Sequence, residues 1–164
     1  MNQLRDLSLM ALTMCAIIQA GAQLFAVSII ARTVSKAPPR SFAILSGEYA
    51  YDSRPFWDIV PMITLILFLA AIIANWKTAR RKFLLSAFAL YFAGGIIAMI
   101  YLEPTFDGMF ARGYADYVDP VMQEEAWRWW MFDCAAWAVS FMSCVLLLFA
   151  LVRPTAATNL RTQE

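Results

Sequence analysis

Residues 60–102 read VPMITLILFLAAIIANWKTARRKFLLSAFALYFAGGIIAMIYL, two apolar runs separated by a basic stretch of six residues. The runs 60–76 and 83–102 contain no Asp, Glu, Lys or Arg. Each is close to the roughly 20 residues that an α-helix needs to cross a hydrocarbon core about 30 Å thick. Because the linker is so short, the two helices are expected to form an antiparallel hairpin across a bilayer.

Two further apolar runs, 7–31 and 129–152, flank this hairpin, and Asp133 is the one acidic or basic residue in all four runs. The chain is 15% charged, against roughly 25% in an average soluble domain. Arg5 and Ala20-Gly21-Ala22 give the first run some features of a cleaved export signal, but its apolar character continues beyond a typical signal core. We therefore predict an all-α fold, an integral membrane four-helix bundle with two long outer loops, as a single domain over residues 1–164 with spans at 7–31, 60–76, 83–102 and 129–152.

The linker 77–82 sets the expected orientation, since it carries four basic residues and no acid. Short loops rich in Lys and Arg stay in the cytoplasm. Both termini are then cytoplasmic, and we expect a multi-pass protein of the plasma membrane, in a bacterium the inner membrane. Contact with anionic lipid explains the basic linker without a nucleic-acid partner.

Tryptophan marks the ends of the predicted spans. Indole prefers the membrane interface because its ring is apolar while its N–H seeks a hydrogen bond. An interfacial belt is the expected role, and a stacking site for a pigment, quinone or sterol is the alternative. The belt residues are Trp57, Trp127, Trp129 and Trp130 on the outer side and Trp76 on the cytoplasmic side.

Asp133 lies about one turn inside the last of the outer tryptophans. Trp137, Ser140 and Cys144 continue its stripe along one helix face, and Cys15, Gln19 and Gln23 form a matching stripe on the first span. If these faces meet, they form a polar seam inside the bundle. The seam then has two interpretations: hydrogen bonds that lock helix pairing, each contributing roughly 0.6 to 2 kcal/mol, or a polar pocket in which Asp133 accepts a proton.

The remaining residues favour a protein without catalysis. Histidine is absent, Cys15, Cys134 and Cys144 all lie within spans, and no phosphate loop, nucleophile motif or metal-ligand spacing occurs. We predict no metal and no cofactor, although a bound lipid, quinone or pigment is compatible with the seam. The leading hypothesis is an accessory or structural subunit of a larger membrane complex, or a binder of a lipophilic ligand, with membrane lipids and other membrane subunits as partners.

The rival hypothesis is a small membrane enzyme that acts on a hydrophobic aromatic substrate. In this interpretation Asp133 is the base, and Gln19, Gln23 or Tyr91 positions the substrate. The seam or ligand-binding set therefore comprises Gln19, Gln23, Tyr91, Asp133 and Trp137. This hypothesis requires a closed pocket near Asp133 with room for a ring system.

Three short motifs resemble the anthrone-oxygenase-like family of small four-helix membrane proteins: RPFW at 54–57, LEPTFDGM at 102–109 and WRWWMFD at 127–133. The resemblance implies four spans and, for the named member, cofactor-free oxygenation of a polyketide anthrone. Pro104 matches the proline that follows the third helix in the family, but Phe106 stands where Asn is common. Asp133 is the nearest polar residue where Asn or His follows the tryptophans, so the residues expected for that chemistry do not match.

Overall fold

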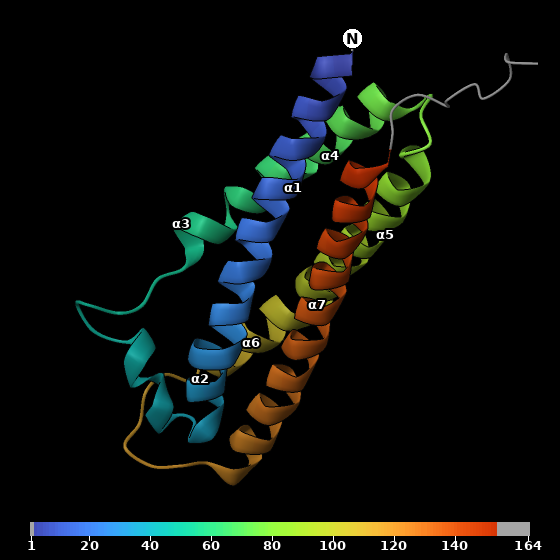
Figure 1. Ribbon diagram of the computed structural model, residues 1–164. Helices are drawn as coiled ribbons and strands as arrows, with labels where there is room; N and C mark the ends of the chain where they lie inside the picture. The colour runs from blue at the N-terminus through green and yellow to red at the C-terminus, as the bar shows by residue number, and fades with distance from the viewer. Residues whose placement is uncertain (1, 154–164) are drawn as a thin grey trace, which may run out of the picture.

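The computed structural model describes residues 2–153, and in this part of the chain it confirms the all-α fold (Figure 1). Four helices are long and apolar enough to cross a membrane: Gln3–Lys36, Arg54–Asn75, Arg81–Phe110 and Pro120–Val152. All four are longer than the predicted spans. A helix of 33 residues measures roughly 50 Å at 1.5 Å per residue, whereas the hydrocarbon core is about 30 Å thick. The longest helices therefore project beyond the hydrocarbon region or cross it at a tilt.

Two of the four helices contain a wide π-helical turn. The first comprises α1 (Asn2–Phe25), the π-helical η1 (Ala26–Ala31) and α2 (Arg32–Lys36). The third comprises α5 (Arg81–Ile97), the π-helical η3 (Ala98–Leu102) and α6 (Glu103–Phe110). The second consists of the short α3 (Arg54–Trp57) followed by α4 (Val60–Asn75), whereas the last, α7 (Pro120–Val152), is uninterrupted.

The two long segments that connect the first span to the second and the third span to the last contain several short helices. Residues 32–56 contain α2, the 3₁₀ helix η2 (Arg40–Leu45) and most of α3, and residues 103–128 contain α6 and the start of α7. The reason lies in local signals, since Pro120 suits a first helical turn and the Asp119 side chain accepts from the backbone N–H of Val121 at 2.9 Å. Gly113, with φ of 75°, supplies the left-handed conformation after α6.

The long helices form a ring in which α1 packs against both α4 and α7, and α5 packs mainly against α7. The hairpin partners α4 and α5 share a smaller interface. We call the end with residues 76–80 the loop end, and the end with α2, η2 and α6 the cap end (Figure 1).

The interior contains two separate apolar clusters. The cluster toward the loop end comprises Leu9, Leu12, Ala16, Ala20, Phe68, Ala71, Ile72, Leu84, Ala87, Cys144, Leu147 and Ala150. The cluster toward the cap end comprises Ala31, Val34, Phe42, Leu102, Met109, Met122, Ala126, Trp129 and Ala136. Along the chain, Gln23 follows the loop-end residues of α1 and Asp133 lies within the cap-end residues of α7. The polar residues thus lie where one cluster gives way to the other.

Candidate functional site

The predicted seam divides into two polar groups, of which the first joins α1, α4 and α5. The Gln19 side-chain oxygen lies 2.9 Å from the Thr64 hydroxyl and 3.3 Å from the Tyr91 hydroxyl, and both hydroxyls can donate to it. Thr64 is fully buried and was not predicted from the sequence. Tyr91 therefore belongs with Gln19 and does not lie in a shared pocket with Asp133.

Each hydroxyl of this group has two possible acceptors but only one proton to donate. The Tyr91 hydroxyl also lies 3.0 Å from the carbonyl oxygen of Pro61, and the Thr64 hydroxyl lies 2.9 Å from that of Val60. Each hydroxyl carries a single proton, so each chooses between the Gln19 amide and a backbone carbonyl of α4. Either choice satisfies the donor inside the apolar interior, which makes the group a tolerant link between helices.

Replacing Tyr91 with Phe and Gln19 with Leu tests this link. In lipid such interhelical bonds contribute on average about 0.6 kcal/mol, so we expect each single variant to lower the free energy of unfolding by about that amount to 1.5 kcal/mol. Because the two side chains share a bond, the double variant should lose less than the sum of the two single losses. Strictly additive losses, measured by reversible unfolding in mixed micelles, would show that the two groups do not interact.

The second group pairs α7 with α1. Asp133 is partly buried, and Gln23 of α1 is a polar neighbour of its carboxyl group. The pair lacks the well-directed bond of ordinary length that Gln19 makes with Thr64. The first and last spans therefore meet, which is the condition that the predicted seam required, and Asp133 lies between them with Gln23 beside it.

Three tryptophans of α7 donate hydrogen bonds to backbone carbonyls of neighbouring helices. Trp137 donates to Ala20 of α1 at 3.2 Å, Trp130 to Val27 at 2.8 Å and Trp129 to Leu102 at 2.9 Å. Val27 lies in η1 and Leu102 in η3. A π-helical turn disturbs the regular ladder of backbone bonds, and in each of these turns an indole N–H satisfies one carbonyl. The tryptophans thus connect α7 to both of its neighbours.

The five predicted belt residues consequently differ in environment. Trp76 and Trp127 are 51% and 48% exposed, as an interfacial position requires. Trp57 and Trp130 are partly buried. Trp129 is only 8% exposed, so its place is in the helix interface of the cap-end cluster and not in a belt that faces lipid headgroups.

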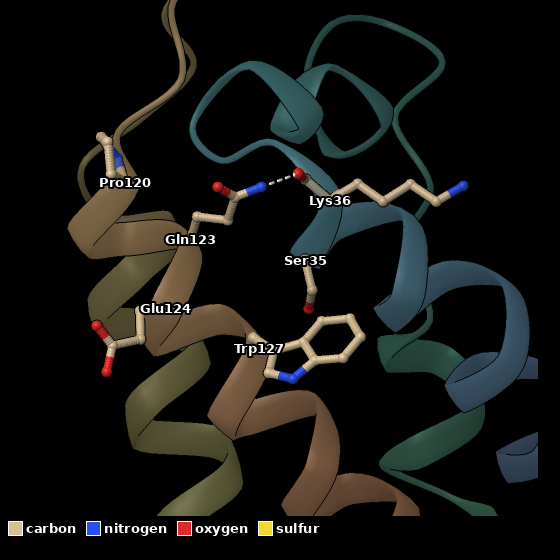
Figure 2. Close-up of a pocket in the computed structure, with 6 residues that line it drawn as sticks. All are labelled: Ser35, Lys36, Pro120, Gln123, Glu124 and Trp127. Atoms are coloured by element: carbon tan, nitrogen blue, oxygen red, sulfur yellow. Dashed lines mark hydrogen bonds between the residues drawn. The ribbon is translucent and has the colours of Figure 1, made fainter.

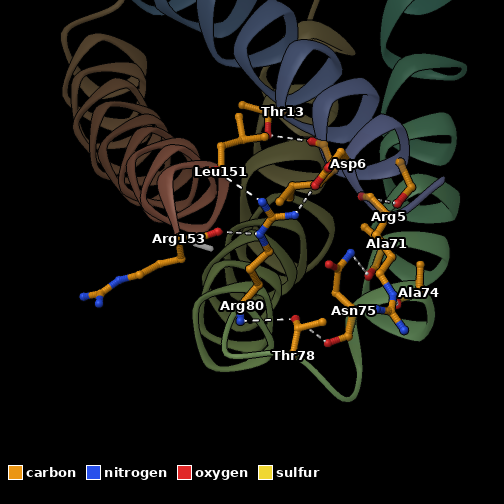
Figure 3. A network of polar contacts seen from close by, with 12 residues as sticks. Arg5, Asp6, Thr13, Ala71, Ala74, Asn75, Thr78, Arg80, Leu151 and Arg153 are labelled. Atoms are coloured by element: carbon orange, nitrogen blue, oxygen red, sulfur yellow. Dashed lines mark hydrogen bonds and ion pairs between the residues drawn. The ribbon is translucent and has the colours of Figure 1, made fainter. Parts of the chain in front are cut away.

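The loop end contains a polar node that the sequence analysis did not identify (Figure 3). Arg80 is only 6% exposed, and its guanidinium forms an ion pair with Asp6 of α1. It also donates to the carbonyl oxygens of Arg153 at 2.9 Å and Leu151 at 3.4 Å. One side chain at the start of α5 therefore connects the N-terminal part of α1 to the C-terminal end of α7.

Asn75 and Arg5 extend this node to the end of α4. The fully buried Asn75 side chain donates to the carbonyl of Ala71 at 3.0 Å, and Arg5 donates to that of Ala74 at 3.0 Å. Unpaired carbonyls at a helix C-terminus attract cationic donors. Asn75, a polar side chain within an apolar run, was the visible signal in the sequence. Nothing distinguished Arg80 from the other basic residues of the linker.

A shallow hollow of about 430 Å³ lies at the cap end between α2 and α7 (Figure 2). Its lining comprises Ser35, Lys36, Pro120, Gln123, Glu124 and Trp127. Gln123 donates to the backbone carbonyl of Lys36, and the Ser35 hydroxyl donates to that of Ala126 at 2.9 Å. The Lys36 ammonium and the Glu124 carboxylate both point away from the hollow (Figure 2), so its polar groups already serve to fasten α2 to α7.

Comparison of the chain with protein-family models, with curated proteins and with solved structures found no match. Within residues 2–153, no group of three or more His, Cys, Asp or Glu side chains is arranged to hold a metal ion. The two polar groups, the tryptophan contacts and the Arg80 node all join helices to one another. The polar contacts of the described interior therefore hold the four long helices together.

Proposed function

We propose that this protein is an accessory subunit of a larger membrane assembly, in which the bundle is the anchor and the cap end is the docking surface. One observation carries the proposal: four of the six tyrosines lie in residues 37–53 and 111–119, here called the cap segments, with exposed side chains. Tyr49, Tyr51, Tyr114 and Tyr117 are 93%, 37%, 51% and 60% exposed. Aromatic side chains are enriched at protein–protein interfaces.

The cap segments that present these tyrosines are fastened to the bundle. Phe42 of η2 is fully buried in the cap-end cluster, and the backbone N–H of Asp119 donates to Pro38 at 2.9 Å. Arg40 and Asp116 form an ion pair between the two segments at 3.6 Å. A surface held in place before binding loses less conformational freedom when a partner docks, which supports docking by the cap.

The positive-inside rule places the loop end, with Lys77, Arg80, Arg81 and Lys82, in the cytoplasm. The cap and its tyrosines then face the opposite side of the membrane. We therefore propose that the partner contributes a domain or loop on that outer side, in addition to any contact within the bilayer.

The alternative, an enzyme with Asp133 as base, is less well supported. It needs an unoccupied polar group beside the carboxyl group to hold a substrate, and the polar side chains of the interior already bond to one another. Gln19 and Tyr91, which this hypothesis assigns to positioning the substrate, bond to each other, and Gln19 also accepts from Thr64.

Site-specific photo-crosslinking in native membranes tests the subunit proposal. A photoreactive phenylalanine analogue is placed at Tyr49 or Tyr117, and at Ile73 as the control, because Ile73 is 75% exposed on an apolar helix face. We expect one discrete protein adduct from the cap positions and lipid adducts from position 73. Recovery of the protein alone and monomeric in mild detergent, without a cap-specific adduct, would overturn the proposal.

A further inference from the structure

The linker between α4 and α5 borders a second, open hollow of about 410 Å³, in which the charged lining residues are all basic. Its lining comprises Trp76, Lys77, Thr78, Ala79, Arg81 and Lys82. We propose that this hollow is a binding site for the phosphate-bearing headgroup of an anionic phospholipid.

The four basic residues of the linker have two different environments. Arg80 turns inward and is committed to Asp6 and to the end of α7. Lys77, Arg81 and Lys82 are exposed, and none of them forms an ion pair among the described residues. Residues 60–102, which include the linker and the helices on both sides of it, contain no Asp or Glu. Three cations therefore line this hollow, and no Asp or Glu of the described residues is part of its lining.

The hollow is formed by a fixed turn. The backbone N–H and the hydroxyl of Thr78 both donate to the Asn75 carbonyl, at 2.9 and 2.8 Å, and the backbone N–H of Arg81 donates to Thr78 at 3.3 Å. Arg81 is also held by stacking, with its guanidinium carbon 5.2 Å from the centre of the Trp76 ring. The cations thus stand on a turn whose backbone is already ordered.

The surroundings favour a lipid over a free anion. Trp76 is half-exposed at the end of an apolar helix, a position typical of the headgroup level. Exposed apolar side chains lie about one turn away from the lining residues along each helix, with Ile73 on α4 and Leu85 on α5. When Lys77, Arg81 and Lys82 hold the phosphate of a phospholipid headgroup, the acyl chains of that lipid lie beside apolar protein surface. Inorganic phosphate gains only the electrostatic contacts.

The test uses the full chain, delipidated in mild detergent and examined by native mass spectrometry with added dioleoylphosphatidylglycerol or dioleoylphosphatidylcholine. We expect tighter binding of the anionic lipid, on the order of tenfold, because each basic residue at the surface attracts anionic lipid. The triple variant Lys77→Gln, Arg81→Gln, Lys82→Gln should bind both lipids equally. The control variant Arg32→Gln, Lys36→Gln, Arg128→Gln removes three exposed basic residues near the cap end and should keep the preference.

Three results would overturn the proposal: equal binding of the two lipids by the unaltered protein, an equal loss in the control variant, or displacement of the anionic lipid by equimolar inorganic phosphate, which would indicate a free-anion site. If the triple variant does not fold, the double variant Lys77→Gln, Lys82→Gln takes its place, and an unchanged lipid preference there counts against the site. The outcome is independent of the proposed docking function, because the cap lies at the other end of the bundle.

Discussion

Replacing Arg80 with Gln is expected to lower the free energy of unfolding by about 3 kcal/mol, because it removes a buried guanidinium that bonds to Asp6 and to two backbone carbonyls, and leaving several such partners unsatisfied has a cost of this order. The Arg80 side chain is 7% exposed, whereas that of Asp6 is 45% exposed. Loss of the arginine leaves the carbonyls of Leu151 and Arg153 without their donor at the end of α7. Loss of the acid should matter less, about 1 kcal/mol for Asp6→Asn, since a half-exposed carboxylate is partly hydrated already.

Neighbouring substitutions separate this effect from a general loss of positive charge. Arg81→Gln removes the same charge from an exposed side chain, so only the stacking contact with Trp76 is lost, about 0.5 to 1 kcal/mol. Arg80→Lys keeps the charge but cannot reach Asp6 and two carbonyls together, and its stability should fall between that of the unaltered protein and Arg80→Gln. Reversible unfolding in mixed micelles, followed by circular dichroism, measures all four. Equal losses at positions 80 and 81 would contradict the role of Arg80 as a link between helices.

The contrast between Arg80 and Arg81 also shows where sequence reasoning reaches its limit. The apolar runs predicted four crossing helices because the bilayer leaves a chain few other ways to satisfy its backbone, and the structure has four suitable helices. Arg80 and Arg81 are adjacent in one basic linker, and for both the sequence indicates only that the linker is cytoplasmic. Which of them turns inward depends on how the ends of α1 and α7 meet, and no local pattern encodes that meeting.

The polar seam was predicted in part for a similar reason. The seam depended on the condition that the stripes of the first and last spans meet, and the contact of Trp137 with Ala20 shows that α1 and α7 do face each other. The bond from Thr64 to Gln19 was missed because a lone threonine in an apolar run commonly bonds only to its own helix. The π-helical turns had no signal in the sequence, although they decide where Trp129 and Trp130 find their acceptors.

Trp129→Ala is expected to destabilise the protein by about 3 to 5 kcal/mol, the usual cost of truncating a buried large aromatic side chain. Trp129 is 8% exposed, its ring centre lies 5.3 Å from that of Phe106, and its N–H satisfies the Leu102 carbonyl. Within a membrane, packing and hydrogen bonds hold helices together because lipid is as apolar as the side chains it would replace. A cavity at this position therefore removes contacts that lipid cannot restore.

Trp129→Phe and Trp127→Ala identify which property of the indole matters. Phe fills most of the space but leaves the carbonyl in the π-helical turn without its donor, so we expect a loss of about 1 kcal/mol. Trp127 is 48% exposed, and its truncation should change stability by no more than about 1 kcal/mol. An interfacial belt predicts the reverse order, with the exposed Trp127 more important than the buried Trp129. Unfolding of the three variants in the same mixed micelles therefore decides between helix packing and membrane anchoring as the function of the tryptophan-rich start of α7.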